Sequence, residues 1–263
     1  VIALMFGGGI LAAGEKGKLA KDLVSTLYAV IERVMAFIIA LSPIGVFTMM
    51  AWVVATQGPE ILGSLAVVLG CAYLGYIVHA VLCYSFSAKA FAGISPFTFF
   101  EKASPAMIFA FTSTSSAATI PLSKECADEL GAEGDVSSFV IPLGATINMD
   151  GAAIYMGIAA IFAAEVYGIP MPLDRQLTVL LLAVLASIGS MGVPGAALIM
   201  ITMVFTQVGI PLEAIALVAG VDRIMDMART TINVLGDATG ALFVSKLESD
   251  FDPERGERLA AAE

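Results

Sequence analysis

Charged residues are scarce in this sequence. Asp, Glu, Lys and Arg together make up 14% of the 263 residues, and there is a single histidine. Hydrophobic residues make up 59%, and the mean hydropathy is +0.92, far above the values of soluble globular domains. This composition excludes an ordinary soluble domain and predicts a membrane protein with several spans.

Cysteine is rare, and no initiator methionine opens the chain. Three thiols cannot build a disulfide framework, so we expect packing residues or free thiols at Cys71, Cys83 and Cys126. The first apolar run, VIALMFGGGILAA, is too short to cross about 30 Å of hydrocarbon, and no positively charged region precedes it. We expect residues 1–21 to be the end of a transmembrane helix that begins upstream, followed by a cytoplasmic linker.

Four long apolar segments are expected to form helices, at residues 22–58, 60–93, 135–167 and 212–247. Within the first, Ser42-Pro43-Ile44-Gly45 predicts a kink or break, because proline removes a backbone donor and glycine loosens the helix. The second contains the only histidine, His79. Hydrogen bonding in packing is the simpler interpretation of this histidine, and a proton relay is the alternative.

Residues 96–131 and 173–211 do not have the pattern of spans. Each is a pair of short arms around a polar tip, at residues 112–121 in the first and 187–195 in the second. Polar backbone at membrane depth is tolerated only where protein buries it or where it lines a cavity, so we expect two re-entrant helical hairpins. A hairpin followed by a span with a polar centre occurs twice, a weak internal repeat typical of the binding site of secondary transporters.

The last apolar segment carries a stripe of polar side chains. At about 100° of rotation per residue, five of them fall within an arc of roughly 80°: Asp222, Asp226, Arg229, Asn233 and Asp237. One charge near a bilayer centre costs about 2.5–3.5 kcal/mol on insertion scales, so several together indicate a site for ions or substrate. A structural salt-bridge stripe is the alternative. Arg223, outside the stripe, is expected to face loops, acidic neighbours or the membrane interface.

Most of the basic residues outside the spans fall on one side of this layout, which predicts a cytoplasmic C-terminus. The opposite side keeps Arg175. Residues 249–263 would then be a solvated acidic tail in the cytoplasm. The formal net charge of −10 lies largely in loops and in this tail, so it does not require a cationic partner.

Several motifs carry a resemblance to a known family: a serine-rich hairpin tip before TIP, then PLGATINMDG, SIGSMGVPGA and DMARTTINVLGD. With these motifs the chain resembles the glutamate/aspartate transporter family, the dicarboxylate/amino-acid:cation symporters, over the C-terminal two-thirds of a member. The resemblance implies an all-α multi-span fold with broken helices and two re-entrant helical hairpins in an inverted-repeat transport core. It also implies sodium-coupled symport of aspartate or glutamate by alternating access, in the cell membrane and as a homotrimer when full length.

The resemblance also divides the chain. Residues 22–58 would be a scaffold-type transmembrane helix and residues 59–248 the transport core, which contains the hairpins at 96–131 and 173–211 and the helices at 135–167 and 212–247. The implied partners are the substrate, the lipid bilayer and further copies of the protein. Neither a nucleic acid nor an enzymatic activity is implied.

By the same resemblance, Arg229 would pair with the side-chain carboxylate of the substrate, a role that suits the planar guanidinium. Asp226 would hold the α-amino group, and the remaining polar atoms of the substrate would meet both hairpins and the last helix. The implied substrate-binding residues are Ser115, Ser116, Val193, Asp226, Arg229, Thr230 and Asn233.

Sodium is the implied coupling ion, and three sites would supply its oxygen ligands. The first would use Asp237, Asn148, Asn233 and the Gly144 carbonyl. The second would use backbone oxygens at Thr146, Ser187, Ile188 and Ser190. The third would use Asp150 with Asn148.

Four positions depart from the family pattern. Ala152 lacks a hydroxyl that the family aims at the substrate, and Ala197 replaces a glycine. Thr114 stands where some prokaryotic relatives have arginine, and Met227 stands where animal relatives have one. The sequence therefore offers no second guanidinium at either of these places.

Other functions remain open. A proton-coupled carrier of the same family is disfavoured by Asp237, because proton-coupled relatives tend to carry Asn there. A C4-dicarboxylate carrier is disfavoured by Asp226, which would have no ammonium group to pair with. An intramembrane serine hydrolase would need Ser116 or Ser190 with His79, but neither serine lies in a G-x-S-x-G motif. A passive channel suits paired hairpins around a charged stripe less well than a carrier does.

Overall fold

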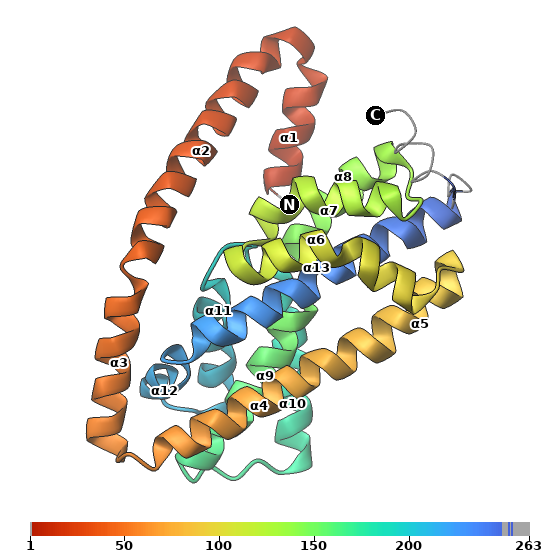
Figure 1. Cartoon of the computed structure of the whole chain (residues 1–263). Helices are drawn as coiled ribbons and strands as arrows, with labels where there is room; N and C mark the ends of the chain where they lie inside the picture. Colours follow the sequence, from red (N-terminus) through yellow and green to blue (C-terminus); the bar gives the residue numbers. More distant parts are fainter. Residues whose placement is uncertain (1, 249–251, 253, 255–263) are drawn as a thin grey trace. The chain divides into compact units, whose positions relative to one another are not determined.

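The structure is a computed structural model that describes residues 2–248, 252 and 254 (Figure 1). Helices are the only regular elements over these residues, which confirms the all-helical prediction. Apart from Asp252 and Glu254, the predicted acidic tail lies outside the described residues. Two compact units divide between Thr48 and Met49. The re-entrant course of the hairpins, the inverted repeat and the division into scaffold and core stay predictions.

The first unit contains two helices and the start of a third. α1 (Ile2–Ala12) and α2 (Lys18–Ala40) are joined by the 3₁₀ turn η1 (Gly14–Gly17). This turn is tight, because a Cβ at Gly17 would lie 2.3 Å from the backbone oxygen of Ile10. The helix is then interrupted at Leu41, and α3 (Ser42–Gln57) follows. The sequence had predicted a break at this point, and it is confirmed.

Two helical stretches of the second unit have the length and hydropathy to cross a membrane. In the first, α4 (Ile61–His79) continues through the π-helical turn η2 (Ala80–Tyr84), α5 (Ser85–Ser87) and the π-helical turn η3 (Ala88–Ala92). The second consists of α8 (Gly134–Ile147) and α9 (Asp150–Val166), which are separated by Asn148 and Met149. Within the described part of the chain, only Ile61–Ala92 and Gly134–Val166 meet this criterion, and they coincide with two of the four predicted segments.

Two pairs of helices occupy the regions predicted as hairpins. α6 (Pro96–Ser113) packs on α7 (Ser116–Glu129), and α10 (Leu173–Ile188) packs on α11 (Ala196–Val208). The first tip is shorter than predicted, because only Thr114 and Ser115 lie outside the helices. Ser115 caps α7 by accepting a hydrogen bond from the Ala118 amide at 3.1 Å, so the helix starts early and includes Pro121.

The last predicted segment, at 212–247, is interrupted. A 3₁₀ turn, η4 (Leu212–Ala214), and α12 (Ile215–Ala219) precede α13 (Asp222–Leu247), with Gly220 and Val221 between them. The expectation of one continuous helix is therefore wrong at its N-terminal end, where Gly220 is a poor helix former. As a result, Asp222 and Arg223 lie in the first turn of α13 rather than in its interior.

α13 lies at the centre of the second unit (Figure 1). It packs against α4, α6, α7, α8 and α9, and many of its residues are buried. Small residues permit the close approach: Ala228, Ala238 and Ala241 are all buried. This packing fixes the positions of the polar side chains on α13.

Candidate functional site

The polar stripe of α13 is buried along its whole length. The exposed fractions are 5% for Asp222, 4% for Asp226, 2% for Arg229, 3% for Asn233 and 2% for Asp237. The periodicity of the sequence predicted that these five residues share one face, and the structure confirms it. Such burial is costly for ionisable groups unless each has a partner, so the partners of each group matter.

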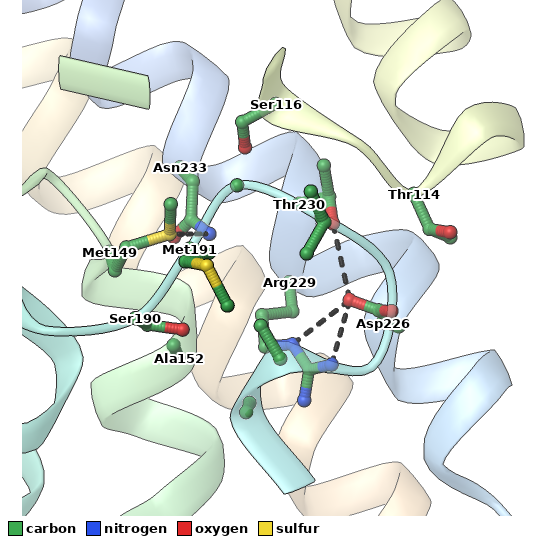
Figure 2. Close-up of a pocket in the computed structure, with 14 residues that line it drawn as sticks. Thr114, Ser116, Met149, Ala152, Ser190, Met191, Asp226, Arg229, Thr230 and Asn233 are labelled. Carbon is green, nitrogen blue, oxygen red and sulfur yellow. Dashed lines mark hydrogen bonds and ion pairs between the residues drawn. The ribbon is translucent and has the colours of Figure 1, made fainter. Parts of the chain in front are cut away.

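A small cavity lies where α13 meets both helix-pair tips and the start of α9 (Figure 2). Its volume is about 10 Å³, which leaves room for about one water molecule. The residues that line it are Thr114, Ser116, Met149, Ala152, Ser190, Met191, Gly192, Val193, Ala196, Ala197, Asp226, Arg229, Thr230 and Asn233. Six of the seven predicted substrate-binding residues are therefore brought together, and Ser115 is the exception.

The loop between α10 and α11 closes this cavity by contacting the other tip and α13. The Gly192 carbonyl accepts hydrogen bonds from the Ala117 amide and the Ser115 hydroxyl, both at 3.1 Å. This explains why the Ser115 hydroxyl does not line the cavity. At the other end of the loop, the Gly195 amide donates to Asp226 Oδ2 at 3.0 Å. A side chain at Gly192 would collide with the structure, because its Cβ would lie 2.4 Å from the Ala145 carbonyl oxygen.

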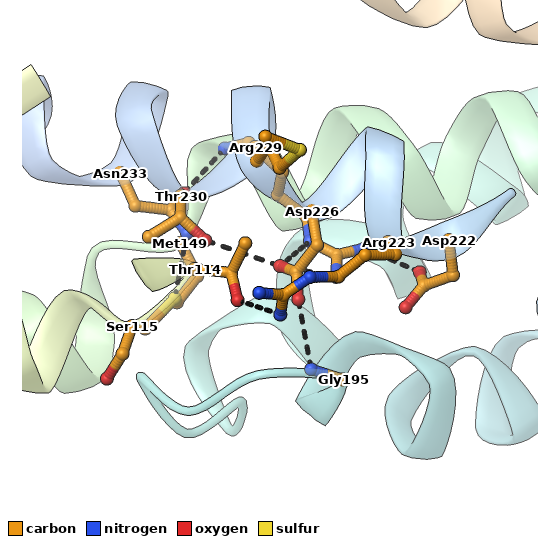
Figure 3. A network of polar contacts seen from close by, with 12 residues as sticks. Thr114, Ser115, Met149, Gly195, Asp222, Arg223, Asp226, Arg229, Thr230 and Asn233 are labelled. Carbon is orange, nitrogen blue, oxygen red and sulfur yellow. Dashed lines mark hydrogen bonds and ion pairs between the residues drawn. The ribbon is translucent and has the colours of Figure 1, made fainter. Parts of the chain in front are cut away.

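Arg229 is the most heavily engaged side chain at the cavity. Its Nη2 lies 2.7 Å from Asp226 Oδ1, and its Nη1 donates to Asp222 Oδ1 at 3.2 Å (Figure 3). The guanidinium carbon also lies 4.5 Å from the centroid of the Tyr155 ring, a distance at which a cation–π interaction is favourable. The guanidinium is thus paired within the protein, although the sequence had led us to expect it to face a substrate.

The break between α8 and α9 meets the middle of α13. Asn148 Nδ2 donates to the Asn233 carbonyl at 2.9 Å and to Asp237 Oδ1 at 3.0 Å. Gly144 is in close contact with the same carboxylate, since a Cβ there would lie 2.4 Å from Asp237 Oδ1. The residues of the first predicted sodium site are therefore neighbours, and their carboxylate and carbonyl oxygens are of the type that hard cations prefer.

Asp150, predicted as a ligand of the third sodium site, is held by the α4–η2 stretch. Its Oδ2 lies 2.9 Å from His79 Nε2 and accepts a hydrogen bond from the Tyr84 hydroxyl. Its Oδ1 is buried and has no hydrogen-bond partner among the described residues. His79 is thus partly buried and hydrogen-bonded, which agrees with its simpler interpretation.

The residues predicted for the second sodium site lie on two helix ends. Thr146 is in the last turn of α8 and Ser187 and Ile188 are in the last turn of α10, and these two helices are in contact. Carbonyl groups in the last turn of a helix carry partial negative charge, and the Ser187 carbonyl already accepts a hydrogen bond from the Ser190 amide at 3.0 Å. Ser190 differs from the other three residues because it lines the small cavity beside Arg229.

Two residues at the site were missed by sequence reasoning. Tyr155, which supports Arg229, is four residues after Gly151 and therefore on the same face of α9. A Cβ at Gly151 would lie 2.4 Å from the Arg229 carbonyl, so a glycine and a tyrosine at this spacing could have indicated the face that packs on α13. The second is Arg223, whose guanidinium donates to the Thr114 hydroxyl in the tip between α6 and α7. A loop was among the surroundings expected for Arg223, but a position beside the cavity was not.

Comparisons with known proteins show the family of the chain. The model of the sodium:dicarboxylate symporter family matches residues 1–247. The chain is 35% identical to a proton/sodium-glutamate symport protein of Geobacillus stearothermophilus, over 98% of the chain and 61% of the relative.

Two further relatives are similar at about the same level. The proton/glutamate-aspartate symporter of Escherichia coli is 33% identical over 96% of the chain and 58% of its own length. Excitatory amino acid transporter 3 of Mus musculus is 33% identical over 94% of the chain and 48% of its own length. The chain thus spans between about half and three-fifths of the length of these relatives.

Proposed function

The chain belongs to the sodium:dicarboxylate symporter family, and on that premise we propose that it is the core of a carrier that moves aspartate or glutamate across a membrane together with sodium. The observation that carries the proposal is the buried Arg229–Asp226 pair beside a cavity that both helix-pair tips close. Two of the named relatives are, by name, symporters of glutamate or of glutamate and aspartate, which supports the substrate class.

The substrate would replace the ion pair between Arg229 and Asp226 with two new ones. In the structure the Arg229 guanidinium pairs with Asp226 and Asp222. An acidic amino acid would place its side-chain carboxylate on Arg229 and its ammonium on Asp226, so every buried charge would keep a partner. This matters because a buried charge that loses its partner is strongly destabilising. The planar guanidinium would also bind the carboxylate with two parallel hydrogen bonds.

The rest of the substrate would meet polar groups that line the cavity, together with Ser115, whose hydroxyl would first have to leave the Gly192 carbonyl. The hydroxyl of Thr230, the amide of Asn233 and the serine tip at Ser115 and Ser116 would bind the α-carboxylate. The Val193 carbonyl would accept a hydrogen bond from the ammonium. Ser116 is the first residue of α7, and a helix N-terminus favours an anion. The Ala117 amide would become available when the loop between α10 and α11 moves, because it now donates to the Gly192 carbonyl.

Sodium coupling is supported by the oxygen atoms around the break in the α8–α9 stretch. Asp237, Asn148, Asn233 and Gly144 are the ligands that we propose for one ion, and Asp150 with Asn148 for another. Backbone oxygens of Thr146, Ser187, Ile188 and Ser190 would form the remaining site. A cation near Asp237 would offset the charge of a carboxylate that is 2% exposed.

Transport would require the closed cavity to open. A volume of about 10 Å³ cannot hold an amino acid. The loop of residues 189–195 would therefore have to move away from Asp226 on α13, and from Ser115 and Ala117 at the other tip. We propose that the two helix pairs are re-entrant hairpins that open to opposite sides, with the C-terminus in the cytoplasm. The assembly would be a homotrimer.

Proton coupling is the second candidate, because the named relatives include both proton and proton/sodium symporters. Sodium is favoured by the identity of Asp237, because proton-coupled relatives tend to carry Asn there. A C4-dicarboxylate substrate is less suitable, because Asp226 would then face the substrate without an ammonium. A serine hydrolase is disfavoured because His79 bonds to Asp150 and is not among the residues that line the cavity with Ser116 and Ser190.

Isothermal titration calorimetry on the purified protein in lipid nanodiscs tests this proposal. Aspartate, glutamate and succinate would each be titrated in sodium, in potassium and at two pH values. We expect aspartate or glutamate to bind in sodium and not in potassium. Affinity that depends on pH but not on sodium would support the proton-coupled alternative. The absence of a binding heat with all three compounds would refute the proposed function.

A further inference from the structure

Arg223 brings a second guanidinium to the edge of the cavity. It extends from the first turn of α13 to the tip between α6 and α7, where its Nη1 donates to the Thr114 hydroxyl (Figure 3). The residue is partly buried, and Thr114 lines the cavity together with Asp226 and Arg229. The charge of Arg223 is thus separated from the cavity by the side chain of Thr114.

Thr114 is held in a conformation that needs support. Its φ of 54° makes it the only non-glycine residue with positive φ in the described part of the chain. A β-branched residue in this region is strained, and such strain is maintained only where the surroundings fix it. Thr114 is 1% exposed, and its hydroxyl donates to the Ser113 carbonyl at 2.7 Å while it accepts from Arg223. The tip and the guanidinium therefore fix each other.

The charges in the first two turns of α13 balance only when Arg223 is counted. Asp222 and Asp226 contribute two negative charges and Arg229 one positive charge, which leaves a net charge of about −1 in a site with little water. Arg223 brings the sum to about zero. A neutral amino acid carries no net charge, but an acidic one carries about −1, and it would enter an already negative site if Arg223 were absent.

We propose that Arg223 is a specificity-determining residue, which favours acidic over neutral amino acids by supplying the second positive charge at this cavity. The inference rests on the proposed function for its substrate class. Arg229 would bind the carboxylate directly, whereas Arg223 acts through the potential at the site and through the position of Thr114. Because it acts at a distance, its charge matters more than the shape of its side chain.

The test compares the affinities of aspartate and asparagine, which have nearly the same shape but differ by one charge. Both are measured in saturating sodium, asparagine by competition with aspartate. Arg223→Gln removes the charge, Arg223→Lys keeps it without the planar fork, and Thr114→Val keeps the charge but removes the hydroxyl that holds it. Arg175→Gln removes a charge from an exposed position on α10 and is the matched control.

We expect Arg223→Gln to lower the affinity for aspartate by about tenfold or more and to change the affinity for asparagine by less than about threefold, because one nearby positive charge is lost. Arg223→Lys and Arg175→Gln should keep the aspartate preference within about threefold of the parent, and Thr114→Val should lower it to an intermediate value. The inference is overturned if Arg223→Gln leaves the preference for aspartate over asparagine unchanged. It is also overturned if Arg223→Lys and Arg223→Gln lower this preference equally. A parent protein that binds neither amino acid instead refutes the proposed function.

Discussion

The Asn148 amide lies between Asp237 Oδ1, at 3.0 Å, and the Asn233 carbonyl, at 2.9 Å. Both acceptors are on α13, so the two hydrogens of Nδ2 are used and the orientation of the amide group is fixed. The Asn148 oxygen then points away from these acceptors and remains free to bind a cation. One side chain in the break between α8 and α9 thereby organises the candidate sodium site.

Asp237→Asn keeps the shape of this side chain and removes its charge. We expect sodium affinity to fall by about 10- to 100-fold, as the loss of a charged interaction of about 1.5–3 kcal/mol implies. Aspartate affinity should fall with it, because coupling between two sites is reciprocal. Aspartate titrations at several sodium concentrations check this, with the exposed Asp135→Asn as control. An unchanged dependence on sodium would remove Asp237 from the site.

Gly144→Ala tests the same site by packing. The new Cβ would lie 2.4 Å from Asp237 Oδ1 and 3.3 Å from Asp237 Cβ, so the carboxylate must shift away from Asn148. We expect lower sodium affinity and a loss of stability of about 1–3 kcal/mol, measured by sodium titration and thermal unfolding.

The matched control for Gly144→Ala is Gly157→Ala in α9. A Cβ at Gly157 would have no atom within 4 Å, so the variant should keep its sodium affinity and gain up to about 1 kcal/mol of stability. Equal behaviour of the two variants would show that the contact between Gly144 and Asp237 does not control sodium binding.

Local sequence patterns predicted much of this arrangement. The polar stripe on α13 follows from helical periodicity alone, and Ser42-Pro43 marked the break after α2. Contacts between distant segments were less accessible. No local rule connects Arg223 with Thr114, and the short first tip depends on the cap that Ser115 forms. Gly220, which ends α12, was hidden in an apolar run that otherwise matches a continuous span.

Asp226→Asn should separate amino acids from dicarboxylates. The substitution removes the counter-charge of the substrate ammonium, so we expect aspartate affinity to fall by about 10- to 100-fold. Succinate has no ammonium, and Arg229 would be released from its 2.7 Å contact with Asp226, so succinate affinity should stay level or rise. Competition binding with both ligands measures the difference. An equal loss for the two would mean that Asp226 does not bind the amino group.

Arg229→Cys removes the group proposed to bind the side-chain carboxylate. We expect aspartate and glutamate binding to be lost, and small neutral amino acids to bind in the space that the guanidinium leaves.

The variant also leaves Asp222 and Asp226 without their buried cation, which should lower the stability by about 3–5 kcal/mol. Loss of aspartate binding alone would therefore be ambiguous. Binding of serine or cysteine by the same preparation resolves the ambiguity, because only a folded site can bind them. Arg229→Lys is the companion variant: it keeps the charge but lacks the planar fork, so it should retain stability and bind aspartate weakly. Full aspartate affinity in Arg229→Cys would show that the guanidinium does not bind the substrate.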